Sequence, residues 1–249
     1  MISIRNISKR FGSQVVLDGV NLEIEPGSTT AVVGPSGVGK SVLLKLIMGI
    51  LQPESGEITV CGENITRAKS EAEKNHIRSS LGVLFQSAAL FDSLTVYDNV
   101  AFPLIEKGGY SRRQIHARVE EMLDALSLSA NAFNYPEEIS MGMRKRVGMA
   151  RSLITEPRVL LFDEPNTGLD PLMGQEVYDL ISACSEKWGF TGVVISHELP
   201  EVFQVSDRVA MLLGGCIVAE GSPEELIASE NEAVQQFLNG NTDGPIKIQ

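Results

Sequence analysis

One stretch of the sequence has the residue types and spacing of a phosphate-binding loop. It consists of Gly34, Pro35, Ser36, Gly37, Val38, Gly39, Lys40 and Ser41, which match the pattern G-x-x-x-x-G-K-[ST]. Glycines at these positions let backbone N–H groups point at phosphate oxygens, and a following helix adds its positive N-terminal end. The cation of Lys40 suits the β- and γ-phosphates, and the hydroxyl of Ser41 suits Mg²⁺. The stretch therefore predicts a site for ATP and Mg²⁺.

Two adjacent carboxylates follow a second apolar stretch. Residues 159–162 read Val-Leu-Leu-Phe, and Asp163 and Glu164 come directly after them. Asp163 is suited to hold the hydration shell of Mg²⁺, and Glu164 to polarise an attacking water. Taken alone, the pair could be a solvated acidic turn ended by Pro165. A phosphate loop in the same predicted sheet favours the hydrolytic role.

The elements that must position these residues alternate between strands and helices. Strand patterns occur at residues 2–7, 20–24, 29–33, 159–162 and 192–195, and helical patterns at 41–49, 111–126, 143–153 and 172–188. This alternation predicts an α/β fold with a largely parallel sheet and helices on its faces. In such sheets, phosphate sites lie at the carboxyl ends of the strands. The character changes to helices between about residues 87 and 151, and the tail after Asn239 is polar.

Composition and charge limit the kinds of partner and site. The chain has 249 residues and a net charge of −11, which argues against broad, sequence-independent binding to nucleic acid. Its three cysteines are far apart, so neither a disulfide framework nor a zinc site is expected, and a reducing cytosol fits. No signal segment precedes the first strand, and no apolar run approaches the about 18 residues of a membrane span. We therefore expect a soluble protein whose membrane role, if any, comes through a partner.

Further segments, in order, resemble those of ATP-binding cassette (ABC) ATPase subunits over nearly the whole chain. Asn166-Thr167-Gly168-Leu169-Asp170 resembles the D-loop of that family, and Ile139-Ser140-Met141-Gly142-Met143 lies where the family carries its signature sequence. Three single residues occupy positions of the family's Q-loop glutamine, switch histidine and adenine-stacking aromatic: Gln86, His197 and Phe11. The resemblance implies a P-loop NTPase core with a mostly parallel sheet, antiparallel β elements near the N-terminus and an inserted α-helical subdomain.

The resemblance also implies domain boundaries. One ABC ATPase domain would span residues 1–239, with its RecA-like core at 1–86 and 152–239 and the helical subdomain at about 87–151. Residues 240–249 would form a C-terminal tail, and their Gly/Pro-rich composition suggests that the tail reaches a second copy.

The resemblance assigns a role to each site residue. Glu164, His197 and Gln86 would be catalytic, Ser41 and Gln86 would hold Mg²⁺ with Asp163 acting through water, and Phe11 would stack on adenine. As alternatives, Gln86 could be a surface residue at a strand end, His197 a structural histidine and Phe11 a core or turn aromatic. Ser140 and Gly142 would cap the γ-phosphate bound by a second copy of the chain, at a helix N-terminus.

The signature segment departs from the family pattern at one residue. The family normally has Ser-Gly-Gly, whereas this chain has Ser140-Met141-Gly142. If the position needs a positive φ, Met141 strains the loop; if it does not, the side chain crowds the nucleotide. Either effect predicts slowed turnover or weakened ATP-dependent dimerisation.

Other stretches resemble ABC ATPases that serve MCE-type (Mla) phospholipid transporters. These stretches are residues 84–100, 143–146, 234–240 and 243–245. The resemblance implies a head-to-tail dimer on the cytoplasmic face of the bacterial inner membrane, membrane permease subunits docking near residues 87–103, and an MCE-domain lipid-binding protein in the complex. No nucleic acid partner is implied.

Two other functions remain open at this point. A soluble ABC ATPase that acts on DNA or ribosomes is opposed by the acidic charge and the lack of a long coiled-coil insertion, and co-purification with a permease would exclude it. A slowly hydrolysing ATP-dependent switch is suggested by Met141 and opposed by Glu164 and His197. Single-turnover hydrolysis would separate that switch from a transport ATPase.

Overall fold

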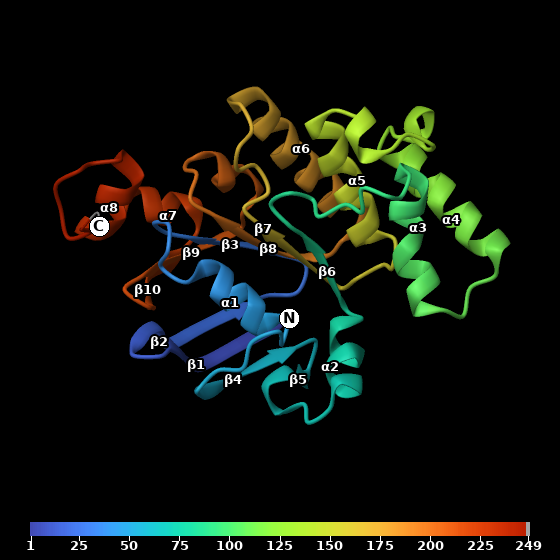
Figure 1. Ribbon diagram of the computed structural model, residues 1–249. Coiled ribbons are helices and arrows are strands. Elements are labelled where there is room, and N and C mark those ends of the chain that lie inside the picture. The colour runs from blue at the N-terminus through green and yellow to red at the C-terminus, as the bar shows by residue number, and fades with distance from the viewer. Residues whose placement is uncertain (248–249) are drawn as a thin grey trace.

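A computed structural model describes residues 1–247 as two sheets with helices around them (Figure 1). The larger sheet has six strands in the order β10-β9-β3-β8-β7-β6. Their bounds are β3 Thr29–Val33, β6 Leu81–Leu84, β7 Val159–Asp163, β8 Thr191–Ser196, β9 Arg208–Leu213 and β10 Cys216–Gly221. All neighbouring pairs are parallel except β10 with β9. The expected α/β fold with a mostly parallel sheet is confirmed.

The second sheet is antiparallel and lies near the N-terminus, as expected. Its order is β2-β1-β4-β5, with β1 Ile2–Phe11, β2 Gln14–Ile24, β4 Ser55–Val60 and β5 Glu63–Asn64. The first two strands are longer than the sequence patterns predict. They pair across a tight turn, and this pairing continues as far as Phe11 and Gln14.

The four helices predicted from the sequence are confirmed as α1, α4, α5 and α6, and their ends lie within two residues of the predicted ends. They are α1 Lys40–Ile47, α2 Glu71–Arg78, α3 Val96–Lys107, α4 Arg112–Ala125, α5 Met141–Leu153, α6 Pro171–Trp188, α7 Pro223–Ile227 and α8 Glu232–Asn239, with 3-10 turns at Ile65–Arg67, Ser129–Asn131, Pro136–Glu138 and Glu201–Val205. Ser111 caps α4 through a reciprocal capping box with Gln114, which explains why that helix starts there. Helices α3, α4 and α5 gather on one side of the molecule in Figure 1, and α5 runs two residues past the boundary expected at 151.

The larger sheet is covered on both faces, which is why its strands are apolar without alternation. Ala31, Val33 and Phe162 belong to the core cluster that includes the buried side chains of α3, α4, α5 and α6. Val32 and Leu161 face the opposite cluster, which includes α1 and the antiparallel sheet. A change in the pairing register of these strands would move their side chains to the wrong face, so the register is fixed. The loops at the carboxyl ends of the strands are therefore held in place.

The described part of the tail folds onto its own chain. The amide of Gln236 on α8 donates to the carbonyls of Asn241 (3.2 Å) and Ile246 (3.0 Å), and it accepts from the backbone N–H of Ile246 (2.7 Å). The expected contact with a second copy remains a prediction, and residues 248 and 249 of that segment lie outside the described residues.

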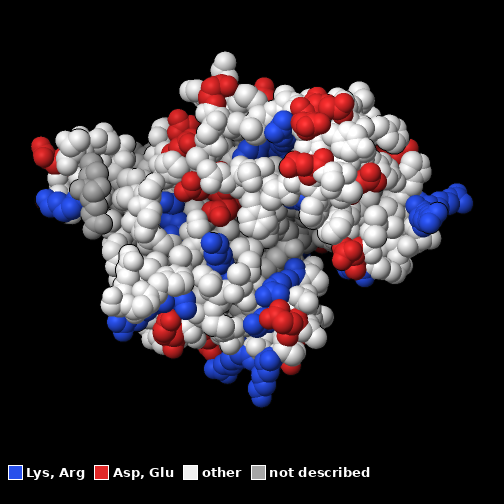
Figure 2. Space-filling model, viewed as in Figure 1, with Lys and Arg blue, Asp and Glu red and all other residues white. Residues whose placement is uncertain are grey.

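On the face shown in Figure 2, basic side chains are interspersed with acidic ones. Within residues 1–247, no helix is both long enough and apolar enough to cross a bilayer.

Candidate nucleotide site

Four of the predicted site segments meet at one edge of the larger sheet. Gly34 follows β3, Gln86 lies just beyond β6, Asp163 ends β7 and His197 follows β8. These four strands are parallel and adjacent in the order β3-β8-β7-β6, so their carboxyl ends share an edge. The sheet thus brings together residues that are up to about 160 positions apart in the sequence. Ligands of open parallel sheets bind in the crevice at this edge.

The phosphate loop has a backbone that only glycine adopts readily. Gly34, Gly37 and Gly39 have φ values of 146°, 80° and 108°. Gly39 is the N-cap of α1, and no side chain caps the helix there. The first N–H groups of an uncapped helix lack partners, and with the helix dipole they form an anion site. The loop can therefore cradle the phosphates of a nucleotide.

Lys40 lies inside the loop rather than on the surface. It is 4% exposed, and its Nζ donates to the carbonyls of Gly34 (2.7 Å) and Pro35 (2.9 Å). Burial lowers its pKa, opposed by the negative charges of Glu164 and Asp163, and Nζ lies 4.0 Å from Oε1 of Glu164. A buried ammonium group bound mainly to carbonyls is suited to donate to phosphate oxygens, which would add to the negative charge around it.

Ser41 and Asp163 are in contact although 122 positions separate them. Oγ of Ser41 donates to Oδ1 of Asp163 at 3.0 Å. Burial raises the pKa of Asp163, and the Ser41 hydrogen bond partly opposes this rise. A hydroxyl beside a carboxylate suits Mg²⁺, which prefers oxygen ligands and keeps several waters. In the described part of the chain, no cluster of three or more His, Cys, Asp and Glu side chains is arranged to hold a metal ion.

Glu164 is held in an uncommon backbone conformation. Its φ is 48°, its N–H donates to the carbonyl of Ile195 (3.0 Å), and its Oε2 accepts from Oγ1 of Thr167 (3.2 Å). Nδ1 of His197 lies 3.2 Å from Oε1 of Glu164, without the alignment of a hydrogen bond. A non-glycine residue in this region costs about 1–3 kcal/mol and persists where its surroundings enforce it. The carboxylate and the imidazole thus lie side by side.

Gln86 and Phe11 are both exposed to solvent. The side chain of Gln86 makes no hydrogen bond within residues 1–247. Phe11 ends β1 at the hairpin turn and is 49% exposed, with Nζ of Lys9 5.3 Å from its ring centroid. The core alternative for Phe11 is therefore wrong. The next strand does reach the loop, since a Cβ on Gly39 would lie 2.9 Å from Cγ1 of Val16.

The signature segment begins helix α5. Its backbone distinguishes the two effects expected of Met141, which are strain in the loop and crowding of the nucleotide. Ser140 is the N-cap of α5, and its Oγ accepts from the N–H of Met143 at 3.2 Å. Met141 is the first helical residue, has no positive φ and is 46% exposed. Backbone strain at Met141 is therefore excluded, and crowding of a bound nucleotide remains. Helix α5 packs against α3, α6 and β6.

A buried polar network next to the site was not predicted from the sequence. Oδ1 of Asn166 accepts from the hydroxyl of Tyr178 (3.1 Å), its Nδ2 donates to Glu198, and Ser196 lies 3.3 Å from the same hydroxyl. The D-loop is thereby joined to the segment that carries His197. The polar residues Asn166 and Ser196, beside the two motifs, could have indicated such a network. No sequence pattern identifies Tyr178 on α6 as their partner.

Replacing Tyr178 with phenylalanine is expected to lower the free energy of unfolding by about 1–3 kcal/mol, because it leaves buried polar atoms without a partner. Urea unfolding measures the change. Tyr110→Phe is the matched control, since the ring of Tyr110 packs 5.1 Å from the Arg118 guanidinium and phenylalanine keeps that contact. Equal losses in the two variants would contradict the network's importance.

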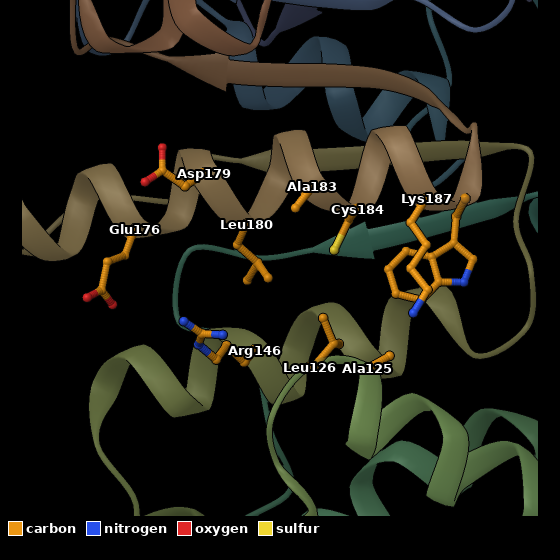
Figure 3. Close-up of a pocket in the computed structure, with 10 residues that line it drawn as sticks. Ala125, Leu126, Arg146, Glu176, Asp179, Leu180, Ala183, Cys184 and Lys187 are labelled. Atoms are coloured by element: carbon orange, nitrogen blue, oxygen red, sulfur yellow. The ribbon is translucent and has the colours of Figure 1, made fainter.

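The cleft shown in Figure 3 is separate from the candidate nucleotide site. Its volume is about 350 Å³, and in Figure 3 Leu180 of α6 points across it toward Arg146 of α5, while Cys184 points toward Leu126. Its lining residues are Ala125, Leu126, Arg146, Glu176, Asp179, Leu180, Ala183, Cys184, Lys187 and Trp188, none of which is a predicted site residue.

Comparisons with known proteins identify the family of the chain. Residues 17–167 match the family described as ABC transporter. The chain belongs to this family. It is therefore an ATP-binding cassette, and its enzymatic activity is ATP hydrolysis.

The relatives and solved structures that this chain resembles match it over almost its whole length. It is 39% identical over 249 residues to the intermembrane phospholipid transport system ATP-binding protein MlaF of Haemophilus influenzae, covering 100% of this chain and 94% of the relative. The MlaF protein of Escherichia coli K12 is also 39% identical, with 100% and 92% covered. The dimeric post-hydrolysis structure of the cassette MJ0796 bound to ADP and Pi has a TM-score of 0.79 and 30% identity, covering 90% of this chain and 99% of that one.

Proposed function

We propose that this chain is the ATP-hydrolysing subunit of an inner-membrane ABC transporter for phospholipids. The observation that carries the proposal is the 39% identity, over the whole chain, to ATP-binding proteins of intermembrane phospholipid transport systems. The phosphate loop, the Glu164–His197 pair and the sheet edge that assembles them support the hydrolytic part.

Binding would be the task of the loop and of α1. The N–H groups from Gly34 to Ser41 would surround the β- and γ-phosphates, with Lys40 turning from its loop carbonyls to the phosphate oxygens. Ser41 and Gln86, with Asp163 through water, would hold Mg²⁺, which supplies positive charge to the phosphates when bound. The exposed ring of Phe11 would stack on adenine.

Hydrolysis would depend on Glu164 and His197. The Glu164 carboxylate would orient a water molecule and accept its proton as that water attacks the γ-phosphorus. The bond from the γ-phosphorus to the bridging oxygen would break, and ADP would leave with phosphate as the other product. His197, 3.2 Å away, would keep the carboxylate in place and donate to the γ-phosphate. The strained backbone at Glu164 supports this role, because strain of this kind concentrates at functional positions.

The second half of the site would come from another copy of the chain. Ser140 and Gly142 at the N-terminus of α5 would cap the γ-phosphate bound by the partner, in a head-to-tail dimer. The similar cassette MJ0796 forms a dimer with ADP and Pi bound, which supports this arrangement.

An apolar groove near residues 87–103 supports permease docking. Its volume is about 400 Å³, and Phe85, Phe91, Phe102 and Pro103 line it together with Arg151. Phe91 is exposed and its ring centroid lies 4.7 Å from that of Phe102, whereas Val96 of the same segment is buried in the core. A permease helix in this groove would place the chain on the cytoplasmic face of the membrane, with an MCE-domain protein elsewhere in the complex.

Co-purification followed by transport tests the proposal. The chain is expressed with candidate permease and MCE-domain proteins from the same organism, and any complex that forms is reconstituted in phospholipid vesicles. ATP- and Mg²⁺-dependent movement of labelled phospholipid to or from the MCE protein is the expected result. A complex that forms and hydrolyses ATP without moving phospholipid would contradict the substrate, and absence of any permease partner would contradict the transport role.

Replacing Met141 with glycine is expected to raise the steady-state ATPase rate of the assembled complex, because it removes a flexible side chain beside the partner's nucleotide. Glycine at the first helical position relieves no strain, so the free energy of unfolding should fall slightly, by less than about 1 kcal/mol. Arg112→Gly, which changes the exposed first residue of α4, is a suitable control. An unchanged ATPase rate would exclude crowding, and slow single-turnover hydrolysis in both proteins would favour the switch.

A further inference from the structure

Lys145 is a lysine in the interior of the protein. It lies on α5, one turn after the signature segment, and only 1% of it is exposed. Within residues 1–247 it forms no ion pair, and burial lowers its pKa to about 8. A buried cation without a carboxylate partner destabilises a fold compared with an apolar residue of the same shape. Its presence therefore calls for an explanation other than stability.

The Lys145 ammonium joins two segments that carry proposed catalytic residues. Its Nζ donates to the backbone carbonyl of Gln86 and to that of Pro165. Gln86 lies in the segment after β6, and Pro165 directly follows Glu164 after β7. One side chain of α5 thus contacts the Q-loop and the Glu164 segment together.

These contacts bracket the strained residue. On one side, the Glu164 N–H is bound to the Ile195 carbonyl at 3.0 Å. On the other side, the backbone carbonyl of the following residue, Pro165, is bound by Lys145. The left-handed conformation at Glu164, with φ of 48°, lies between these two anchors. Removing one anchor would let the peptide relax and move the carboxylate.

We propose that Lys145 is a positioning residue for ATP hydrolysis, which holds the backbones of Gln86 and Glu164 in a set relation to the signature helix. The proposal rests on the roles proposed above for Gln86 and Glu164. It implies that a displacement of α5 is transmitted to both segments through one ammonium group. The loop that binds ATP is not among the contacts of Lys145, so binding and turnover should respond differently to its loss.

The test compares three variants of the full-length chain in its assembled complex. Lys145→Met keeps an unbranched side chain but removes the donors, Lys145→Arg keeps a charged donor, and Lys107→Met changes an exposed lysine at the end of α3 as control. For Lys145→Met we expect kcat for ATP to fall roughly 10- to 100-fold, since small misplacements of catalytic groups cost up to about that much, with Kd for ATP changed less than about 3-fold. Lys145→Arg should recover part of the loss, and Lys107→Met should match the unmodified chain.

Hydrogen exchange gives a readout that is independent of catalysis. In the nucleotide-free protein, Lys145→Met should accelerate amide exchange at residues 86–88 and 164–168, and not in the core of β3. Unchanged kcat and unchanged exchange in a folded Lys145→Met protein would overturn the proposal. Equal loss of binding and turnover would also overturn it, since that indicates general damage. If the methionine variant does not fold, Lys145→Gln, a neutral donor of shorter reach, is measured by the same criteria.

Failure of the proposed function would look different. In that case Glu164→Gln would hydrolyse ATP like the unmodified chain, whatever Lys145 does. A Glu164→Gln protein that is inactive beside a fully active Lys145→Met protein would overturn the positioning role alone.

Discussion

Replacing Glu164 with glutamine is expected to lower kcat for ATP hydrolysis about 10²- to 10⁴-fold, the usual contribution of a general base. Glutamine keeps the size and the hydrogen bond from Thr167, so the backbone at this position should persist. What is lost is the carboxylate that we propose accepts the proton of the attacking water. ATP binding should remain, because the phosphate loop and Lys40 are unchanged, and the bound ATP should then hold two copies together for longer.

The measurement is steady-state phosphate release at saturating ATP, together with size-exclusion chromatography in ATP and Mg²⁺. Glu186→Gln is the matched control, since Glu186 is an exposed carboxylate on α6. A Glu164→Gln protein with more than about a tenth of the normal kcat would show that another group takes the proton. Loss of ATP binding in the same protein would instead point to a structural role for Glu164.

The second large effect concerns two glycines of the phosphate loop, which should differ sharply when each is replaced with alanine. A Cβ on Gly34 would lie 2.2 Å from the backbone oxygen of Leu212 on β9, and neither backbone can move without disturbing β3 and β9. A Cβ on Gly37 would meet nothing within 4 Å. Both residues have positive φ, so both substitutions carry the left-handed penalty of about 1–2 kcal/mol.

Gly34→Ala should therefore lower the free energy of unfolding by about 3 kcal/mol or more and abolish ATP binding, since overpacking is added to the strain. Gly37→Ala should cost about 1 kcal/mol and weaken ATP binding moderately, through the conformation of the loop. Urea unfolding and titration with a fluorescent ATP analogue measure the two quantities. Similar losses of stability in both variants would show that the contact with Leu212 relaxes easily.

Features that depend on neighbouring residues could be predicted from the sequence. The phosphate loop, the apolar strand before Asp163 and Glu164, and the helix capped by Ser111 each depend on residues close in the chain, so their patterns suffice. The parallel direction of the strands follows from the β–α–β alternation, and it places a phosphate site at their carboxyl ends. The strand order, which brings the four segments together, is seen only in the folded sheet. Strand β4 and the extra length of β1 and β2 were not predicted, because pairing between strands decides their extent.

The residue patterns were enough to predict a phosphate loop and a candidate carboxylate for the attacking water, and to point to the family to which the chain belongs. How these groups are held depends on contacts that only the folded chain makes. Met141 begins a helix, Phe11 is exposed, Tyr178 lies behind the D-loop, and Lys145 reaches two backbone carbonyls from the interior. The physical reason is that burial, and the contacts it imposes between distant segments, cannot be read from the spacing of residues along one chain.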